Sequence, residues 1–137
     1  MYPLGLQQTI SQPVSVKGFG YWNGLDVRVE FRPAPVDAGI TFVRGDLGPN
    51  ARVAARADLR TEVPRRTSLR CGDVQVDMVE HILAALAGLQ VDNCEVWVDQ
   101  AEMPGCDGSA QSFVEAIKTA GIVPQGATAR RLIIADE

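Results

Sequence analysis

Hydrophobic periodicity changes along the chain, and this change most limits the folds that the chain can adopt. Residues 25–32 alternate apolar and polar side chains, the period-two pattern of a strand with one buried face. Residues 40–44 and 94–99 repeat this strand pattern. Residues 82–89 and 110–120 instead place apolar side chains at helical spacing. Strands followed by two helices, with one strand between the helices, predict an α+β fold: a single mixed β-sheet with two helices on one face.

Glycine and serine residues predict where several elements begin and end. Asn23-Gly24, in a segment with three glycines (17–24), predicts a hairpin between two strands. A glycine loop that cradles phosphate would need a helix after it, whereas a strand follows here. Gly88 is predicted to end the first helix in a left-handed cap, and Gly121 is predicted to end the second helix. Ser109 is predicted to cap the start of the second helix.

Two segments carry weaker signals. Residues 51–66 are rich in Ala and Arg, without clear periodicity, and are predicted only as strand plus loop. Residues 130–134 are predicted to form a final strand, because their run of apolar side chains follows a polar segment.

Composition narrows the function classes. The 137 residues suit one domain, and the formal net charge of −4, without a basic run, disfavours nucleic-acid binding. No apolar stretch reaches membrane-spanning length, and the first residues lack the features of a secretory signal. Three cysteines without a Cys-x-x-Cys motif argue against a disulfide framework. We therefore expect a cytoplasmic protein whose cysteines are small buried or half-buried residues.

Glu80 and His81 are the main candidates for chemistry. His81 is the only histidine of the chain and follows Glu80 at the predicted start of the first helix. Neighbouring side chains point about 100° apart on an ideal helix, but at a helix start both can line one cleft. The helix dipole there favours an ionised carboxylate, which suits a general base. A capping acid beside a half-exposed histidine explains the same pair without any chemistry, so the two residues alone decide nothing.

Metal binding by this chain alone is not favoured by its sequence. A catalytic zinc usually takes three protein ligands, and the chain has one histidine. A separate metal site formed by Cys71, His81 and Cys106 within this chain is an alternative. The spacing of these residues, however, matches no standard zinc motif.

Six motifs match a single family in order and spacing. They are Gly18-x-Gly20-x-x-x-Gly24, residues 31–35 (Phe-Arg-Pro-Ala-Pro), residues 66–69 (Arg-Thr-Ser-Leu), residues 79–93 (beginning Val-Glu-His), residues 102–110 (containing Asp-Gly-Ser) and residues 113–122. Together they resemble the bacterial UDP-3-O-acyl-N-acetylglucosamine deacetylase family over nearly the whole chain. The resemblance implies a zinc-dependent hydrolase that removes an acetyl group from an acylated UDP-sugar in lipid A, and hence lipopolysaccharide, biosynthesis.

The resemblance also implies an architecture and residue roles. Members of the family have two α+β domains, each like a ribosomal-protein S5 domain 2 unit, with the active site between them. Residues 1–137 resemble the first domain only. Glu80 then corresponds to the general base that activates the metal-bound water, and His81 to one zinc ligand. The other ligands and a further catalytic histidine belong to the second domain. Thr67 and Leu69 resemble a segment that lies near the substrate.

Three departures from the family pattern lie around this site. Residues 21–23 (Tyr-Trp-Asn) stand where the family has a histidine, and residues 104–106 (Pro-Gly-Cys) replace a more apolar loop. Met78 replaces a hydroxyl residue that usually caps the helix, and Asp77 is predicted to cap it instead.

Two hypotheses follow from the resemblance. In the first, the chain is the N-terminal half of the deacetylase, inactive alone and completed by a second domain, a partner chain or a further copy of itself. Its ending near Glu137, where the family crosses into its second domain, agrees with this hypothesis. In the second, the chain is a non-catalytic domain that binds a partner protein or a nucleotide sugar.

Overall fold

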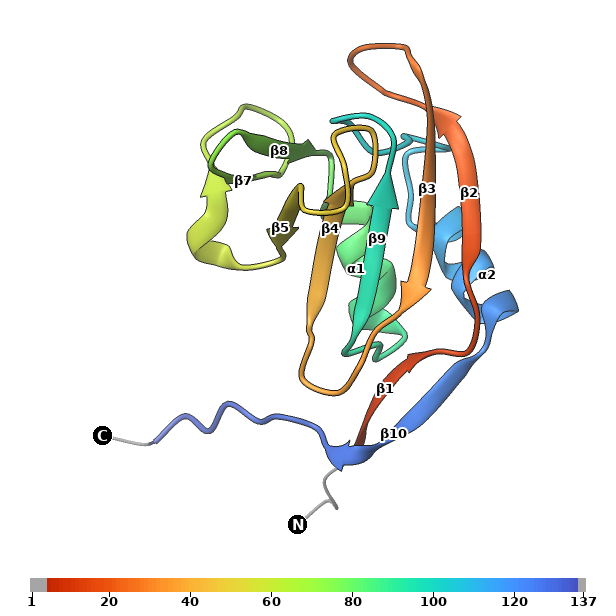
Figure 1. Cartoon of the computed structure of the whole chain (residues 1–137), viewed down its shortest axis with the longest axis vertical. Coiled ribbons are helices and arrows are strands. Elements are labelled where there is room, and N and C mark those ends of the chain that lie inside the picture. The colour runs from red at the N-terminus through yellow and green to blue at the C-terminus, as the bar shows by residue number, and fades with distance from the viewer. Residues whose placement is uncertain (1–4, 136–137) are drawn as a thin grey trace.

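The computed structural model describes residues 5–135, which form two α-helices, one short 3-10 helix and ten strands (Figure 1). The helices are α1 (Glu80–Gly88), α2 (Gln111–Ala120) and the 3-10 helix η1 (Ala57–Leu59). The strands are β1 (Leu6–Ile10), β2 (Val14–Phe19), β3 (Asp26–Pro33), β4 (Ile40–Arg44), β5 (Arg52–Ala54), β6 (Arg60–Thr61), β7 (Ser68–Cys71), β8 (Val74–Asp77), β9 (Cys94–Val98) and β10 (Ile122–Thr128).

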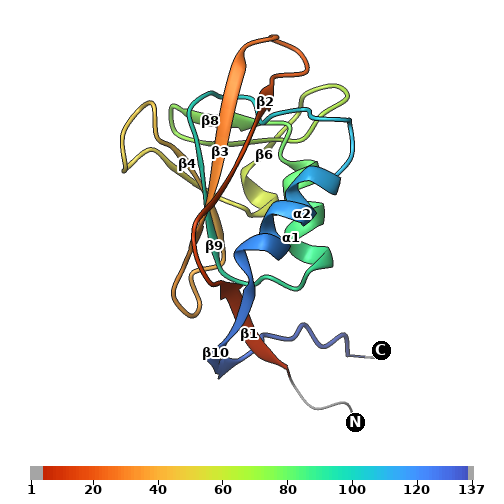
Figure 2. The ribbon, with the colours of Figure 1, turned by 90° about the vertical axis from the view of Figure 1, so that its right-hand side faces the viewer.

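The main sheet has five strands in the order β2-β3-β9-β4-β5. It is mixed, because β9 pairs in parallel with β4 and antiparallel with β3. Both helices cover one face of this sheet (Figure 2). The predicted α+β class, with two helices on one face of a mixed sheet, is therefore confirmed.

The prediction of a single sheet is wrong, because two smaller sheets accompany the main one. β1 pairs with β10, and β6, β7 and β8 form a three-stranded sheet. The unclear pattern of residues 51–66 has a simple cause: β5 has three residues and β6 has two, which is too few per face to show a periodicity.

The core lies between the main sheet and the helices. α1 buries Ile82 and Leu86, and α2 buries Phe113 and Ile117. The ring of Phe113 meets the ring of Phe31 from β3 edge to face, with centroids 6.2 Å apart and planes at 68°. This contact packs α2 against the main sheet.

The predicted strand at 130–134 is wrong. The last strand of the described chain is β10, whose Pro124 and Gly126 conceal its strand pattern in the sequence. β10 takes up the pairing with β1, in a register that begins at Leu6↔Thr128. Residues 130–134 form no strand, and the side chains of Leu132, Ile133 and Ile134 are exposed. An apolar segment with no strand beside it cannot form the inter-strand hydrogen bonds of a sheet.

The helix ends agree with the sequence in part. Gly121 ends α2 with a positive φ of 82°, as predicted. Gly88 is instead the last residue of α1, and the left-handed residue is Gln90, with φ of 58°. The predicted N-cap at Ser109 is wrong by one residue: α2 begins at Gln111 and its N-cap is Ala110, without a side-chain cap hydrogen bond. Ser109 lies one residue earlier, and its Oγ accepts the N–H of Gln111 over 3.1 Å.

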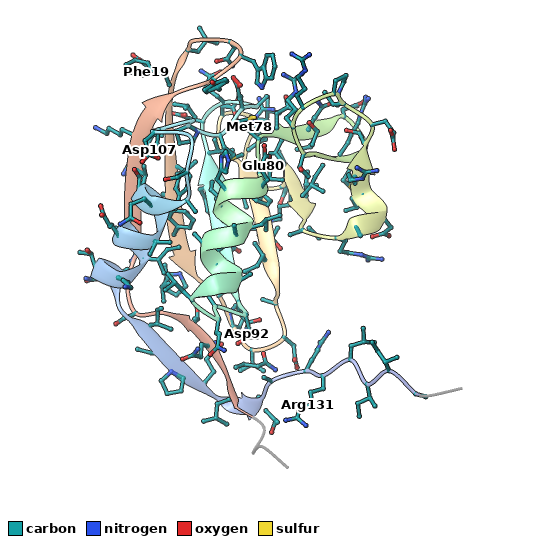
Figure 3. The ribbon with its side chains drawn as sticks, turned by 180° about the vertical axis from the view of Figure 1, so that it is seen from behind. Phe19, Met78, Glu80, Asp92, Asp107 and Arg131 are labelled. Atoms are coloured by element: carbon teal, nitrogen blue, oxygen red, sulfur yellow. The ribbon has the colours of Figure 1, made fainter. Side chains whose placement is uncertain are left out.

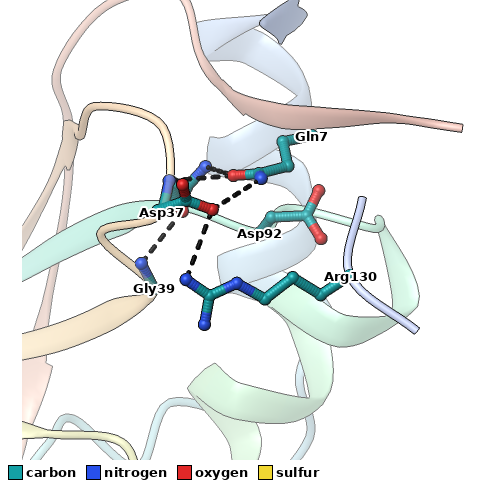
Figure 4. A pocket seen from close by; sticks show the side chains of 6 residues that line it. Gln7, Asp37, Gly39, Asp92 and Arg130 are labelled. Carbon is teal, nitrogen blue, oxygen red and sulfur yellow. Dashed lines mark hydrogen bonds and ion pairs between the residues drawn. The ribbon is translucent and has the colours of Figure 1, made fainter. Parts of the chain in front are cut away.

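A polar network at the other end of the sheet holds the β1–β10 pair in place (Figure 4). Gln7 donates through Nε2 to Asp37 Oδ1 and accepts the N–H of Asp37 at Oε1, both over 2.9 Å. Arg130 forms an ion pair with the same Asp37 carboxylate at 3.3 Å. Asn93, buried behind Gln7, accepts the N–H of Gly39 over 2.9 Å. The network ties the β1–β10 pair to the loop between β3 and β4.

None of the helices between residues 5 and 135 combines the length and the apolar character that a membrane span requires.

The three cysteines differ in exposure. Cys94 is buried at the start of β9, where burial raises the pKa of its thiol to about 12. Cys71 and Cys106 are exposed, so the prediction of buried or half-buried cysteines is wrong for both. A turn after β7 holds Cys71 at the surface, and the loop before α2 does the same for Cys106.

We therefore expect a thiol reagent at mildly alkaline pH to label Cys71 and Cys106 in the folded chain and to leave Cys94 unlabelled. The thiolate is the reactive form, and a buried thiol with a raised pKa supplies little of it. Mass spectrometry of the labelled peptides measures this pattern. Labelling in denaturant is the control and should modify all three cysteines; rapid labelling of Cys94 in the folded chain would contradict the expectation.

Candidate active site

The chain enters α1 through an unusual backbone turn. Met78 has a positive φ of 62° and Val79 is the N-cap, without a side-chain cap hydrogen bond. The predicted capping by Asp77 is wrong: its Oδ1 instead accepts hydrogen bonds from Ser68 Oγ at 2.6 Å and from Gln75 Nε2 at 2.8 Å. The side chain of Asp77 thus bonds within the β7–β8 hairpin, and no side chain caps the first turn of α1.

Glu80 is the first residue of α1 and is half-buried. Its Oε2 accepts the backbone N–H of Thr67 over 3.1 Å, and the N–H of Val79 donates to the carbonyl of Thr67 over 3.3 Å. The carboxylate is therefore oriented from outside its own helix.

Glu80 and His81 line one pocket of about 240 Å³. The other residues of its lining are Tyr21, Trp22, Arg65, Met78, Gly105 and Gly108. These come from the β2–β3 connection, from the segment before β7 and from the loop before α2. Figure 3 shows Glu80 and Met78 at one end of α1, while Asp92 and Arg131 lie toward the opposite end of the molecule. The helix start thus lets two adjacent side chains face one pocket, as the sequence predicted.

The β2–β3 connection is fixed against the loop before α2. Gly105 donates its N–H to the carbonyl of Phe19 over 2.8 Å, and the ring of Tyr21 packs on Gly105. Trp22 meets Tyr21 edge to face at 6.2 Å, and the guanidinium of Arg66 lies 5.3 Å from the Trp22 ring centroid. An aromatic and cationic wall therefore faces Glu80 and His81. The sequence places these aromatics in a hairpin but gives no sign of which element they would pack on.

Asp107 adds a carboxylate on the His81 side. Its pKa is held below the usual range, mainly by hydrogen bonds from the hydroxyl and N–H of Ser109, with a smaller contribution from the charge of His81. Asp107 is exposed and stays ionised over the neutral pH range. The Asp-Gly-Ser motif marks this residue in the sequence, but its proximity to His81 appears only in the folded chain.

The two candidates for substrate contact, Thr67 and Leu69, lie differently with respect to the pocket. The side chain of Leu69 is 3% exposed and belongs to the hydrophobic core, so it offers no surface to a ligand. Thr67, by contrast, contacts Glu80: its backbone N–H donates to the Glu80 carboxylate. Among residues 5–135, no group of three or more His, Cys, Asp or Glu side chains is close enough to hold a metal ion. The hypothetical site of Cys71, His81 and Cys106 is therefore not formed.

Comparison with known proteins shows the family of the chain. Residues 7–137 match the family described as LpxC, UDP-3-O-acyl N-acetylglycosamine deacetylase. The chain belongs to this family. A deacetylase of this name from Stenotrophomonas maltophilia is 46% identical over 90% of the chain, and one from Anaeromyxobacter is 45% identical over 93%. A bifunctional enzyme LpxC/FabZ from Chlorobaculum tepidum is 40% identical over 93%.

The chain is much shorter than these relatives. It spans 41% of the length of the Stenotrophomonas and Anaeromyxobacter proteins and 27% of the bifunctional enzyme. The chain therefore corresponds to only part of those proteins.

Proposed function

We propose that this chain is the N-terminal part of a zinc-dependent UDP-3-O-acyl-N-acetylglucosamine deacetylase of lipid A biosynthesis, whose active site a second domain completes. The observation that carries the proposal is the joint exposure of Glu80 and His81 in one pocket, with the Glu80 carboxylate oriented by the N–H of Thr67. Membership of the family supports it.

The described residues do not by themselves fit a zinc ion. They offer His81 as a single imidazole, whereas catalytic zinc sites take three protein ligands. We therefore assign His81 as one ligand and place the others in the second domain. A zinc ion held by His81 together with ligands of the second domain would supply Lewis-acid polarisation of the amide carbonyl.

Glu80 carries the proton transfer in this proposal. Water adds to the acetyl carbonyl carbon while the Glu80 carboxylate takes a proton from it. The C–N bond then breaks, and Glu80 returns the proton to the leaving amine nitrogen, which gives acetate and a free amine. Thr67 keeps the carboxylate oriented through its N–H. Tyr21 and Trp22 line the same pocket and give it an aromatic side.

Zinc titration tests the proposal. We expect the purified chain to bind zinc weakly alone and tightly when mixed with the C-terminal remainder of the Stenotrophomonas relative, with deacetylation only in the mixture. His81→Ala should abolish the gain in zinc affinity. Because His81 is the only histidine, its imidazole resonances in the labelled chain report directly on zinc binding.

Each contrary result has a defined meaning. Tight zinc binding without deacetylation in the mixture would reject the catalytic role. Equal zinc affinity of wild type and His81→Ala would reject His81 as a ligand. A Cys71→Ser variant is the matched control, since Cys71 lies outside the pocket and should leave zinc affinity unchanged.

A further inference from the structure

A buried carboxylate behind the pocket has no part in the proposed reaction. Glu102 is 3% exposed and lies in the segment between β9 and α2. Burial of a charged side chain is unfavourable unless hydrogen bonds replace its water. Glu102 Oε1 accepts the N–H of Trp22 over 2.7 Å, and its Oε2 accepts the N–H of Asn23 over 3.0 Å. Both oxygens therefore point at one short stretch of backbone.

That stretch is the rim loop, residues 20–25, which connects β2 to β3. Its Tyr21 and Trp22 line the pocket of Glu80 and His81, yet they are 70% and 49% exposed. A loop with so little buried surface is not held by packing alone. Charge-assisted hydrogen bonds to two consecutive N–H groups are stronger than neutral ones and fix both position and orientation.

The fit between Glu102 and the rim loop requires a glycine. A Cβ atom added to Gly20 would lie 2.0 Å from Asn23 Oδ1 and 2.3 Å from Glu102 Oε2. Gly20 also forms an isolated β-bridge with Pro104, two residues beyond Glu102. The absence of a side chain at Gly20 is therefore what allows the carboxylate to reach the loop.

The same segment is tied to the start of α1. Asp77 donates its N–H to the carbonyl of Ala101 over 2.7 Å, and Met103 donates to the carbonyl of Asp77 over 2.9 Å. These bonds flank Glu102 on both sides along the chain. Glu102 thus connects the rim loop to the turn that places Glu80.

We propose that Glu102 is a positioning residue, which holds Tyr21 and Trp22 at a fixed place opposite Glu80 and His81. The inference rests on the proposed deacetylase function for its effect on catalysis. Its structural part, the fixing of the rim loop, stands on the hydrogen bonds alone. A displacement of about 1 Å in such a wall is enough to lower a rate by roughly 100-fold.

Hydrogen exchange in Glu102→Gln tests the structural part. The carboxamide keeps the shape but offers one good acceptor in place of two, and its NH₂ faces a backbone N–H. We expect exchange at the amides of Trp22 and Asn23 to speed up by at least about tenfold, with the amide of Val96 in the sheet unchanged. Asp99→Asn is the matched control: Asp99 also accepts a backbone N–H, from Arg28 over 2.9 Å, but outside the rim loop.

Kinetics of the completed enzyme test the catalytic part. Glu102→Gln should lower kcat/KM by about 10- to 100-fold while zinc affinity stays at the wild-type value. Unchanged exchange at Trp22 and Asn23, or an equal increase at Val96, would overturn the proposal. If the wild-type mixture shows no deacetylation, the proposed function fails, and the exchange data still decide whether Glu102 fixes the loop.

A second variant covers the case in which Glu102→Gln does not fold. Gly20→Ala keeps the Glu102 carboxylate. It disturbs the contact between this carboxylate and the rim loop from the side of the loop. It should speed exchange at the same two amides. Gly88→Ala, where an added Cβ meets no atom within 4 Å, is its control. Wild-type exchange in Gly20→Ala would count against the proposal.

Discussion

Glu80→Gln is expected to lower kcat of the completed deacetylase by about 10²- to 10⁴-fold, the usual contribution of a positioned general base. Glutamine has the same shape, and its carbonyl oxygen can still accept the N–H of Thr67, so the local structure is retained. Its amide nitrogen cannot take up the proton of the attacking water. Steady-state kinetics and zinc titration of the same preparation separate the loss of catalysis from a loss of metal.

Glu62→Gln is the matched control for this variant. The side chain of Glu62 is 93% exposed and lies outside the pocket, so its neutralisation should leave kcat unchanged. Activity of Glu80→Gln equal to that of the wild type would exclude Glu80 as the base. The alternative of a non-catalytic binding domain makes a different prediction: Glu80→Gln would leave the binding of a partner or a nucleotide sugar unaltered.

Phe113→Ala is expected to lower the free energy of unfolding by about 3–5 kcal/mol. Phe113 is fully buried between α2 and the main sheet, and its ring contacts Phe31. Truncation removes buried apolar surface and leaves a cavity that the rigid strands cannot close. Because domains are stable by only about 5–15 kcal/mol, this is a large share of the total. Urea unfolding followed by circular dichroism measures the change.

Phe19→Ala provides the comparison for this effect. Phe19 is 65% exposed on β2, so the same truncation there should change the free energy of unfolding by no more than about 0.5 kcal/mol. Similar losses at Phe19 and Phe113 would contradict the described core.

The parts of the fold that the sequence predicts correctly are those with strong periodicity. The alternation in β3 and the apolar stripe of α2 depend on local spacing, and both elements lie where expected. The wrong predictions concern residues or strands whose interaction partners depend on the folded chain rather than on local spacing. Asp77 resembles a cap in the sequence, but the β7–β8 hairpin binds its side chain. The pairing of β10 with β1 cannot be read from a segment that contains Pro124 and Gly126.

The candidate site shows the same division. Glu80 and His81 stand out in the sequence because a carboxylate and the only histidine are adjacent at a helix start. Glu102 does not stand out, because an acid before Pro104 and Gly105 is typical of a solvated loop. Its burial depends on N–H groups 80 residues away in sequence, which no local pattern records.

The central position of β9 has a consequence for synthesis on the ribosome. β9 is the last strand of the main sheet to be made, yet it lies between β3 and β4. Until β9 has been made, β3 of the β2–β3 hairpin and β4 of the β4–β5 hairpin therefore have no strand to pair with on the edge that faces β9. Translation from the end of β4 to the end of β9 takes roughly 3–10 s at about 5–20 residues per second. During that interval the nascent chain exposes open strand edges to its neighbours, and this is when it is most vulnerable to aggregation.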